Sequence, residues 1–73
     1  MKKRFSPDEV ARLLGITLTT VYREMQRGKL PHLRVGRKYI ILRPDLAAYL
    51  GGEERLEYLL DESEVLTEGL VVP

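Results

Sequence analysis

The sequence near the start of the chain predicts two short helices that are separated by only three residues. The segment Ser6-Pro7-Asp8-Glu9 is typical of a helix beginning: the serine can cap the helix, the proline suits its first position, and the glutamate completes a capping box. Apolar residues then recur at helical spacing as far as Leu14. Gly15 can end the helix because glycine adopts the left-handed conformation at low cost. A first helix is therefore predicted over residues 7–14.

The residues that follow predict a second helix. Thr17 is another capping residue, and Gly28 can end the segment. Between them the side chains divide into an apolar face and a polar face, formed respectively by Leu18, Val21, Tyr22 and Met25, and by Thr19, Thr20, Arg23, Gln26 and Arg27. Two short helices joined by a tight turn that contains glycine indicate a helix-turn-helix motif.

Beyond Pro31 the pattern changes from helical to extended. Two short runs, residues 32–35 and 38–42, flank Gly36-Arg37 and predict a small β-hairpin with a basic tip. Pro44 then opens a third short helix, which runs to about Leu50. The expected fold class is mostly α with a small β-hairpin: a winged helix-turn-helix of three short helices plus a wing, over residues 1–50.

Charge divides the chain at Gly51-Gly52, which we interpret as a hinge. Residues 1–50 hold eleven Lys or Arg against four acids, a net charge of +7. Residues 51–73 hold one Arg against seven acids, a net charge of −6. A body this basic suits a polyanionic partner. Residues 51–73 form the acidic tail, in which residues 53–60 have a helical pattern and residues 63–73 are expected to be flexible.

Composition argues against several classes of protein. With no cysteine and a single histidine, His32, a disulfide framework and a thiolate zinc site are excluded, and no metal or cofactor is implied. No nucleophile with a base, paired carboxylates or phosphate-binding loop indicates an enzyme. No stretch reaches the ~18 apolar residues that cross a bilayer. We expect a cytoplasmic, nucleoid-associated protein that does not bind membranes.

Several separated motifs, in a fixed order, resemble the excisionase-like, MerR-type winged helix-turn-helix family. They cover about two thirds of the chain and comprise Phe5–Ile16, Thr20–Arg23, Gly28–Pro31, Arg34–Tyr39 and Asp45–Leu50. Two features depart from the family. Glu24 stands where an apolar residue is more usual, and the 23 residues after Leu50 are too few for the coiled coil and ligand domain of effector-sensing MerR regulators.

The resemblance implies that the helix from Leu18 to Arg27 enters the major groove of DNA, with the hairpin as a wing near the adjacent minor groove. The position of the polar face agrees, since residues near the start of such a helix reach base edges. The expected base contacts are Thr19, Thr20 and Arg23, and Arg37 is the expected minor-groove residue. The expected backbone contacts are Arg12, Tyr22, Gln26, Arg27, Lys29, Arg34, Lys38 and Arg43.

Other interpretations stay open for individual residues. Arg12 and Arg43 are equally good surface salt-bridge partners, and Thr20 can be a capping residue instead of a base contact. Phe5, Tyr39 and Tyr49 are expected in the core, and His32 in a loop or at a strand edge. Lys2-Lys3-Arg4 is either a disordered arm or one that follows a DNA groove.

The sequence leaves three functions open. The protein is a small transcriptional regulator, a recombination directionality factor of the excisionase type, or an antitoxin-type protein whose residues 53–73 bind a partner protein while the domain represses its operon. The acidic tail can equally be a solvated end, or fold back on the basic face. The protein can also form a homo-oligomer on DNA.

Overall fold

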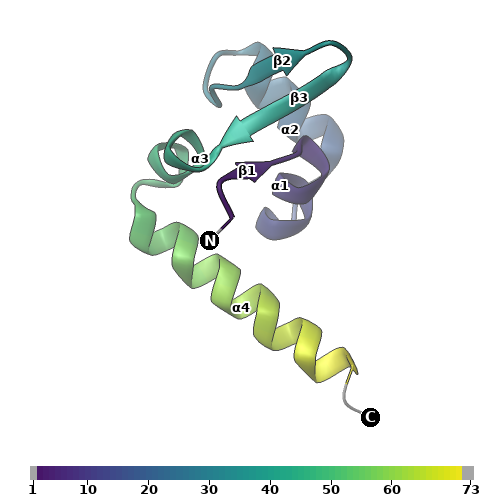
Figure 1. Ribbon diagram of the computed structural model, residues 1–73, viewed down its shortest axis with the longest axis vertical. Helices are drawn as coiled ribbons and strands as arrows, with labels where there is room; N and C mark the ends of the chain where they lie inside the picture. Colours follow the sequence, from purple (N-terminus) through teal and green to yellow (C-terminus); the bar gives the residue numbers. More distant parts are fainter. Residues whose placement is uncertain (1, 72–73) are drawn as a thin grey trace.

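The computed structural model describes residues 2–71, and the side chains of residues 2–62. A three-stranded antiparallel sheet lies among four helices in this part of the chain (Figure 1). In chain order the elements are β1 (Arg4–Phe5), α1 (Pro7–Leu14), α2 (Leu18–Gln26), β2 (Leu33–Val35), β3 (Lys38–Leu42), α3 (Arg43–Leu50) and α4 (Glu53–Val71). The predicted winged helix-turn-helix fold is confirmed.

The α1–α2 pair follows the local signals of the sequence. The Oγ of Ser6 accepts a hydrogen bond from the backbone N–H of Glu9 at 3.1 Å, and the Glu9 carboxylate accepts one from the Ser6 N–H at 3.1 Å. Gly15 ends α1 with a φ of 69°, and Thr17 caps α2 by accepting from the Thr20 N–H at 3.2 Å. Side-chain and backbone partners therefore satisfy the exposed ends of both helices.

The sheet contains the predicted hairpin and one strand that the sequence did not reveal. Strands β2 and β3 pair antiparallel, with Val35 opposite Lys38 next to the turn. On its other edge β3 pairs with β1, where Phe5 faces Ile41. The segment Lys2-Lys3-Arg4 is therefore not a disordered arm, since Arg4 lies in β1 and the Lys3 carbonyl accepts from the Arg43 N–H at 2.9 Å. Backbone pairing fixes this start of the chain.

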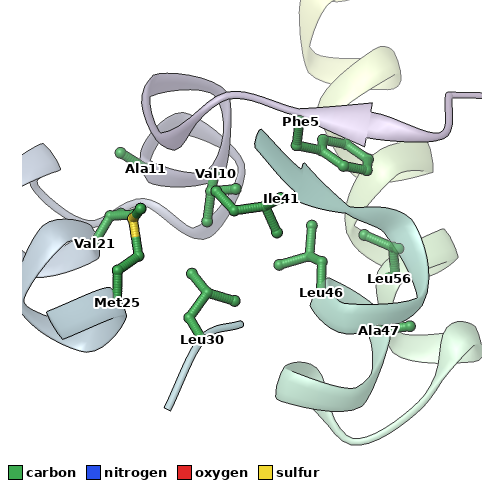
Figure 2. Packing of buried hydrophobic residues seen from close by; sticks show 10 residues of the cluster. All are labelled: Phe5, Val10, Ala11, Val21, Met25, Leu30, Ile41, Leu46, Ala47 and Leu56. Atoms are coloured by element: carbon green, nitrogen blue, oxygen red, sulfur yellow. The ribbon is translucent and has the colours of Figure 1, made fainter. Parts of the chain in front are cut away.

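The core is a cluster of ten buried apolar residues contributed by six elements and one loop (Figure 2). Figure 2 shows these side chains pointing toward one another between α1, α2, the sheet and α3: Phe5, Val10, Ala11, Val21, Met25, Leu30, Ile41, Leu46, Ala47 and Leu56. Phe5 is a core residue as predicted, whereas Tyr39 and Tyr49 are half-buried and pack against the cluster.

The corner between α3 and α4 is a defined turn rather than a free hinge. Gly51 ends α3 with a φ of 100°, and the Gly52 N–H donates to the Ala47 carbonyl at 2.8 Å. Leu56, one turn into α4, is fully buried in the core. The packed domain therefore extends past the predicted limit at residue 50 and includes the start of α4.

Helix α4 is also longer than the sequence pattern indicated. It continues from Glu53 to Val71, beyond the helical pattern of residues 53–60, and the flexibility expected from residue 63 stays a prediction. Residues 72 and 73 lie outside the described residues. The first turn of a helix is costly in conformational entropy, and packing of the start of α4 against the domain offsets this cost. Each further residue then adds one helical hydrogen bond and fixes only its own backbone. In Figure 1, α4 runs away from the sheet and from α2.

Candidate nucleic-acid interface

Helix α2 presents one polar face to solvent. Val21 and Met25 on the opposite face are buried in the core. Rotation of the helix about its axis would withdraw both side chains and leave cavities, so this packing fixes which face is exposed. Exposed residues on this face are Thr19, Tyr22, Arg23, Gln26 and the C-cap residue Arg27, and Leu18 at the start of the helix is exposed as well. Thr20 is half-buried, and its hydroxyl lies 2.8 Å from the capping hydroxyl of Thr17. Of the three predicted base-contact residues, Thr19 and Arg23 are freely exposed, whereas the Thr20 hydroxyl already has a partner in the helix cap.

The wing places its cations around the β2–β3 turn. Arg34, Arg37 and Lys38 are all exposed. The Arg34 Nε donates to the Gly36 carbonyl at 3.2 Å, and its guanidinium lies 5.6 Å from the centre of the Tyr39 ring. Arg34 is thus held against the wing, while Arg37 stands at its tip.

Aromatic contacts connect α2 to the wing. The Tyr22 and Tyr39 rings meet edge to face, with centroids 5.8 Å apart. The His32 ring also meets the Tyr39 ring edge to face, with centroids 5.6 Å apart. The His32 Nδ1 lies 3.0 Å from the Leu30 carbonyl. Edge-to-face pairs of this kind stabilise a packing arrangement beyond the area that they bury. Tyr22, which remains 37% exposed, therefore belongs both to the α2 surface and to the joint with the wing.

Positive charge on α2 and the wing has no ion-pair partner among the described side chains. The ion pairs among the described side chains are Lys2–Glu9 at 2.5 Å, Arg12–Asp8 at 2.7 Å and Arg43–Glu53. None involves α2, the loop after it or the wing. The cations left uncompensated on those elements are Arg23, Arg27, Lys29, Arg34, Arg37 and Lys38. Such a concentration of one sign attracts a polyanion and raises its rate of encounter.

Arg43 does not belong to this surface, which corrects the prediction that it contacts the DNA backbone. Its side chain is only 7% exposed. The Nε donates to the Glu53 carboxylate, and an Nη donates to the Lys2 carbonyl at 3.1 Å. If the Arg43 guanidinium moved out to reach a phosphate, the Glu53 carboxylate and the Lys2 carbonyl would lose their hydrogen-bond donor. Its role is therefore structural. Arg12 is exposed, and its guanidinium bonds Asp8 one turn back on α1.

Glu24, which departs from the resemblance, has a specific partner on α3. The Tyr49 hydroxyl donates to its carboxylate at 2.8 Å. Burial of the phenol, together with the hydrogen bond to Glu24 and its charge, raises the pKa of Tyr49. The pair fixes α2 against α3, and the sequence alone had not brought these two residues together.

Neither a metal centre nor a membrane span is found in the described part of the chain. Residues 2–62 hold no group of three or more His, Asp or Glu side chains arranged to bind a metal ion. None of the four helices is long and apolar enough to cross a membrane.

Comparison with known proteins agrees with this architecture. A family model described as a helix-turn-helix domain matches residues 4–53, about two thirds of the chain. The match runs from the first residue of β1 to Glu53, the partner of Arg43, and so covers β1 to α3 and the first residue of α4. Neither the curated proteins nor the solved structures contain a match. The chain belongs to the helix-turn-helix domain family.

Proposed function

We propose that this protein binds double-stranded DNA in a sequence-specific manner, with α2 in the major groove and the wing beside the adjacent minor groove. The observation that carries the proposal is the joined surface of α2 and the wing. Its cations have no ion-pair partners among the described residues, and the Tyr22–Tyr39 contact holds its two parts together. A helix of this width fits the major groove of B-DNA.

The exposed side chains of α2 divide into two proposed roles. Arg23 and Thr19 face outward near the middle and the start of the helix, and we assign them to base edges. An arginine that contacts guanine with two hydrogen bonds contributes ~1–3 kcal/mol of discrimination. Thr20 has a smaller role, because its hydroxyl also serves the cap. Arg37 is assigned to the minor groove, where a narrow groove concentrates negative potential.

The remaining cations and polar groups of the surface are assigned to phosphates. These are Tyr22, Gln26, Arg27, Lys29, Arg34 and Lys38, which set register without reading sequence. If roughly five phosphates are neutralised, log affinity falls with log salt at a slope of about −4 to −5. A slope near zero would contradict a backbone-contacting surface.

As a biological role, we propose a small transcriptional regulator or a recombination directionality factor that acts at the nucleoid in the cytoplasm. The first experiment is capture of sheared genomic DNA by the purified protein at ~0.15 M salt, a condition under which unspecific binding is weak, followed by sequencing. Enrichment of a short motif beside promoters supports a regulator, and clustered repeats at an integrated element support an excisionase-like factor. Half-sites spaced by one helical turn would indicate a dimer on DNA. No enriched motif would contradict specific recognition.

A second candidate is an antitoxin-type protein, and the surface of α4 favours it. A hollow between α3 and α4 is lined by Leu50, Glu54, Arg55, Tyr58 and Leu59, and its walls are almost wholly apolar. Tyr58 is 70% exposed there. An exposed apolar hollow beside acidic side chains suits an apolar segment of a basic partner protein.

The test is co-expression with the product of a neighbouring gene. Capture by the full chain that is lost in Tyr58→Ala supports this candidate, and no capture by the full chain contradicts it. Glu54→Gln is a matched variant on the rim of the hollow, and it should weaken capture less if the apolar contact dominates. Removal of residues 53–73 is unsuitable as a test, because it also removes Leu56 from the core.

A further inference from the structure

We propose that the hollow between β1, the start of α1 and the wing binds a sugar–phosphate strand of the same DNA duplex, with Arg4 as a contact residue. The inference rests on the proposed function and adds a site to it. The hollow is lined by residues of four regions: Arg4 and Phe5 of β1, the residues from Ser6 to Glu9, Tyr22 of α2, and the residues from Arg37 to Ile40 of the wing.

The position of Arg4 follows from the pairing of β1. Successive side chains of a strand point to opposite faces, so the burial of Phe5 in the core directs Arg4 outward. Pairing with Leu42 on β3 fixes the backbone at this point. Arg4 is exposed and forms no ion pair among the described residues. It is therefore a cation whose backbone is held by the sheet and which lines the hollow together with Arg37 and Lys38.

The two acids that line the hollow have cationic partners. Asp8 pairs with Arg12, and Glu9 pairs with Lys2 while also accepting the Ser6 N–H. Counting these partners, five cations surround the hollow against two carboxylates. The net charge around the hollow is therefore positive, which favours an anion such as a phosphate.

Continuity with the α2–wing surface identifies the occupant as a DNA strand. Tyr22 and Lys38, which we assign to phosphates, also line this hollow. A DNA strand whose phosphates contact Tyr22 and Lys38 would therefore already lie at the edge of this hollow. The first helix of a helix-turn-helix crosses the DNA backbone in known docking geometries, which agrees with a strand that passes the start of α1.

The experiment compares two neighbouring charge removals in the full chain, Arg4→Gln and Lys3→Gln. Lys3 is exposed like Arg4, but its side chain is not part of the hollow. Dissociation constants are measured by fluorescence anisotropy over roughly 0.05–0.3 M salt, on the enriched site and on random duplex DNA. Arg4→Gln should weaken binding severalfold on both DNAs and make the log–log salt slope shallower by about 0.9. Lys3→Gln should leave the slope at its wild-type value.

Further variants separate this inference from the function on which it rests. Arg4→Lys keeps the charge and should restore the slope, and thermal melts of all variants check folding. Equal effects of Arg4→Gln and Lys3→Gln would overturn the phosphate site while leaving DNA binding by α2 intact. Wild-type protein that binds no duplex at all would overturn both.

Discussion

The Tyr49 hydroxyl donates a 2.8 Å hydrogen bond to the Glu24 carboxylate and thereby joins α3 to the α2 helix. The Tyr22–Tyr39 contact joins the same helix to the wing on another side. Together with the buried anchors Val21 and Met25, these contacts orient α2 before any partner binds. A surface ordered in advance loses less conformational entropy on binding, which favours affinity and selectivity.

The first prediction concerns this hydrogen bond. Tyr49→Phe removes the donor and leaves the half-buried Glu24 carboxylate with one partner fewer. The free energy of unfolding should fall by about 1.5–3 kcal/mol, the range for a hydrogen bond to a charged group. Urea denaturation measures it, with Tyr58→Phe on the exposed face of α4 as the matched control. If both variants unfold at the same urea concentration as the wild type, the hydrogen bond has no net effect on stability.

The same hydroxyl predicts a difference at alkaline pH. Burial and the neighbouring Glu24 raise the pKa of Tyr49 above the usual value of 10.0. Its contribution to stability is therefore complete below pH 10 and is lost as the pH rises through the higher pKa of the folded state. Unfolding free energy measured from pH 8 to about 11 should fall more steeply for the wild type than for Tyr49→Phe. Parallel curves would contradict the raised pKa.

Local signals explain which elements could be predicted from the sequence. The capping box at Ser6, the cap at Thr17 and the hairpin turn at Gly36 each act within a few residues, and α1, α2 and the β2–β3 hairpin followed them. Strand β1 was missed because its partner residues, including Ile41, lie far along the chain. A two-residue strand has no periodicity of its own. The extent of α4 was underestimated because burial of Leu56 against distant residues stabilises its start.

The candidate site was predictable only in part, for a related reason. Helical periodicity placed Thr19 and Arg23 on the exposed face, where the structure has them. Charge alone could not separate Arg43 from such residues, because its partner Glu53 lies ten residues away across a turn. Arg4 was likewise not a distinct candidate until its pairing in β1 showed which way it points. Nonlocal contacts decide whether an arginine is structural or available to a ligand.

A second stability prediction tests the structural role of Arg43. Glu53→Gln removes the anionic partner of a guanidinium that is 7% exposed. Breaking a buried pair costs ~3–5 kcal/mol, and because Glu53 is itself half-exposed we expect a loss of about 2 kcal/mol. Glu54→Gln, the neighbouring exposed acid, should change stability by no more than about 0.5 kcal/mol. Equal melting temperatures for the two variants would show that the ion pair does not hold the corner.

A fourth prediction tests whether the start of α4 belongs to the domain. Leu56→Ala leaves a cavity in the core and should lower the unfolding free energy by about 2–5 kcal/mol. Tyr58→Ala, two residues away and 70% exposed, should have little effect. A chain that ends after Glu62 keeps both Leu56 and the half-buried Leu60, and should retain most of the stability. If the shorter chain is unfolded under conditions in which the full chain is folded, residues beyond 62 contribute to the stability of the domain.

The last prediction separates reading of bases from contact with phosphates. Arg23→Ala should weaken binding to the preferred DNA site by about 5- to 150-fold, equivalent to ~1–3 kcal/mol, with a much smaller loss on random DNA. Lys38→Ala should weaken binding to both DNAs by the same factor and make the salt slope shallower by about 0.9. Both side chains are exposed cations without ion pairs among the described residues, so the comparison holds charge constant. Competition binding on the two DNAs measures the ratio directly. If Arg23→Ala lowers affinity equally on every sequence, Arg23 contacts the backbone and another residue of α2 must read the bases.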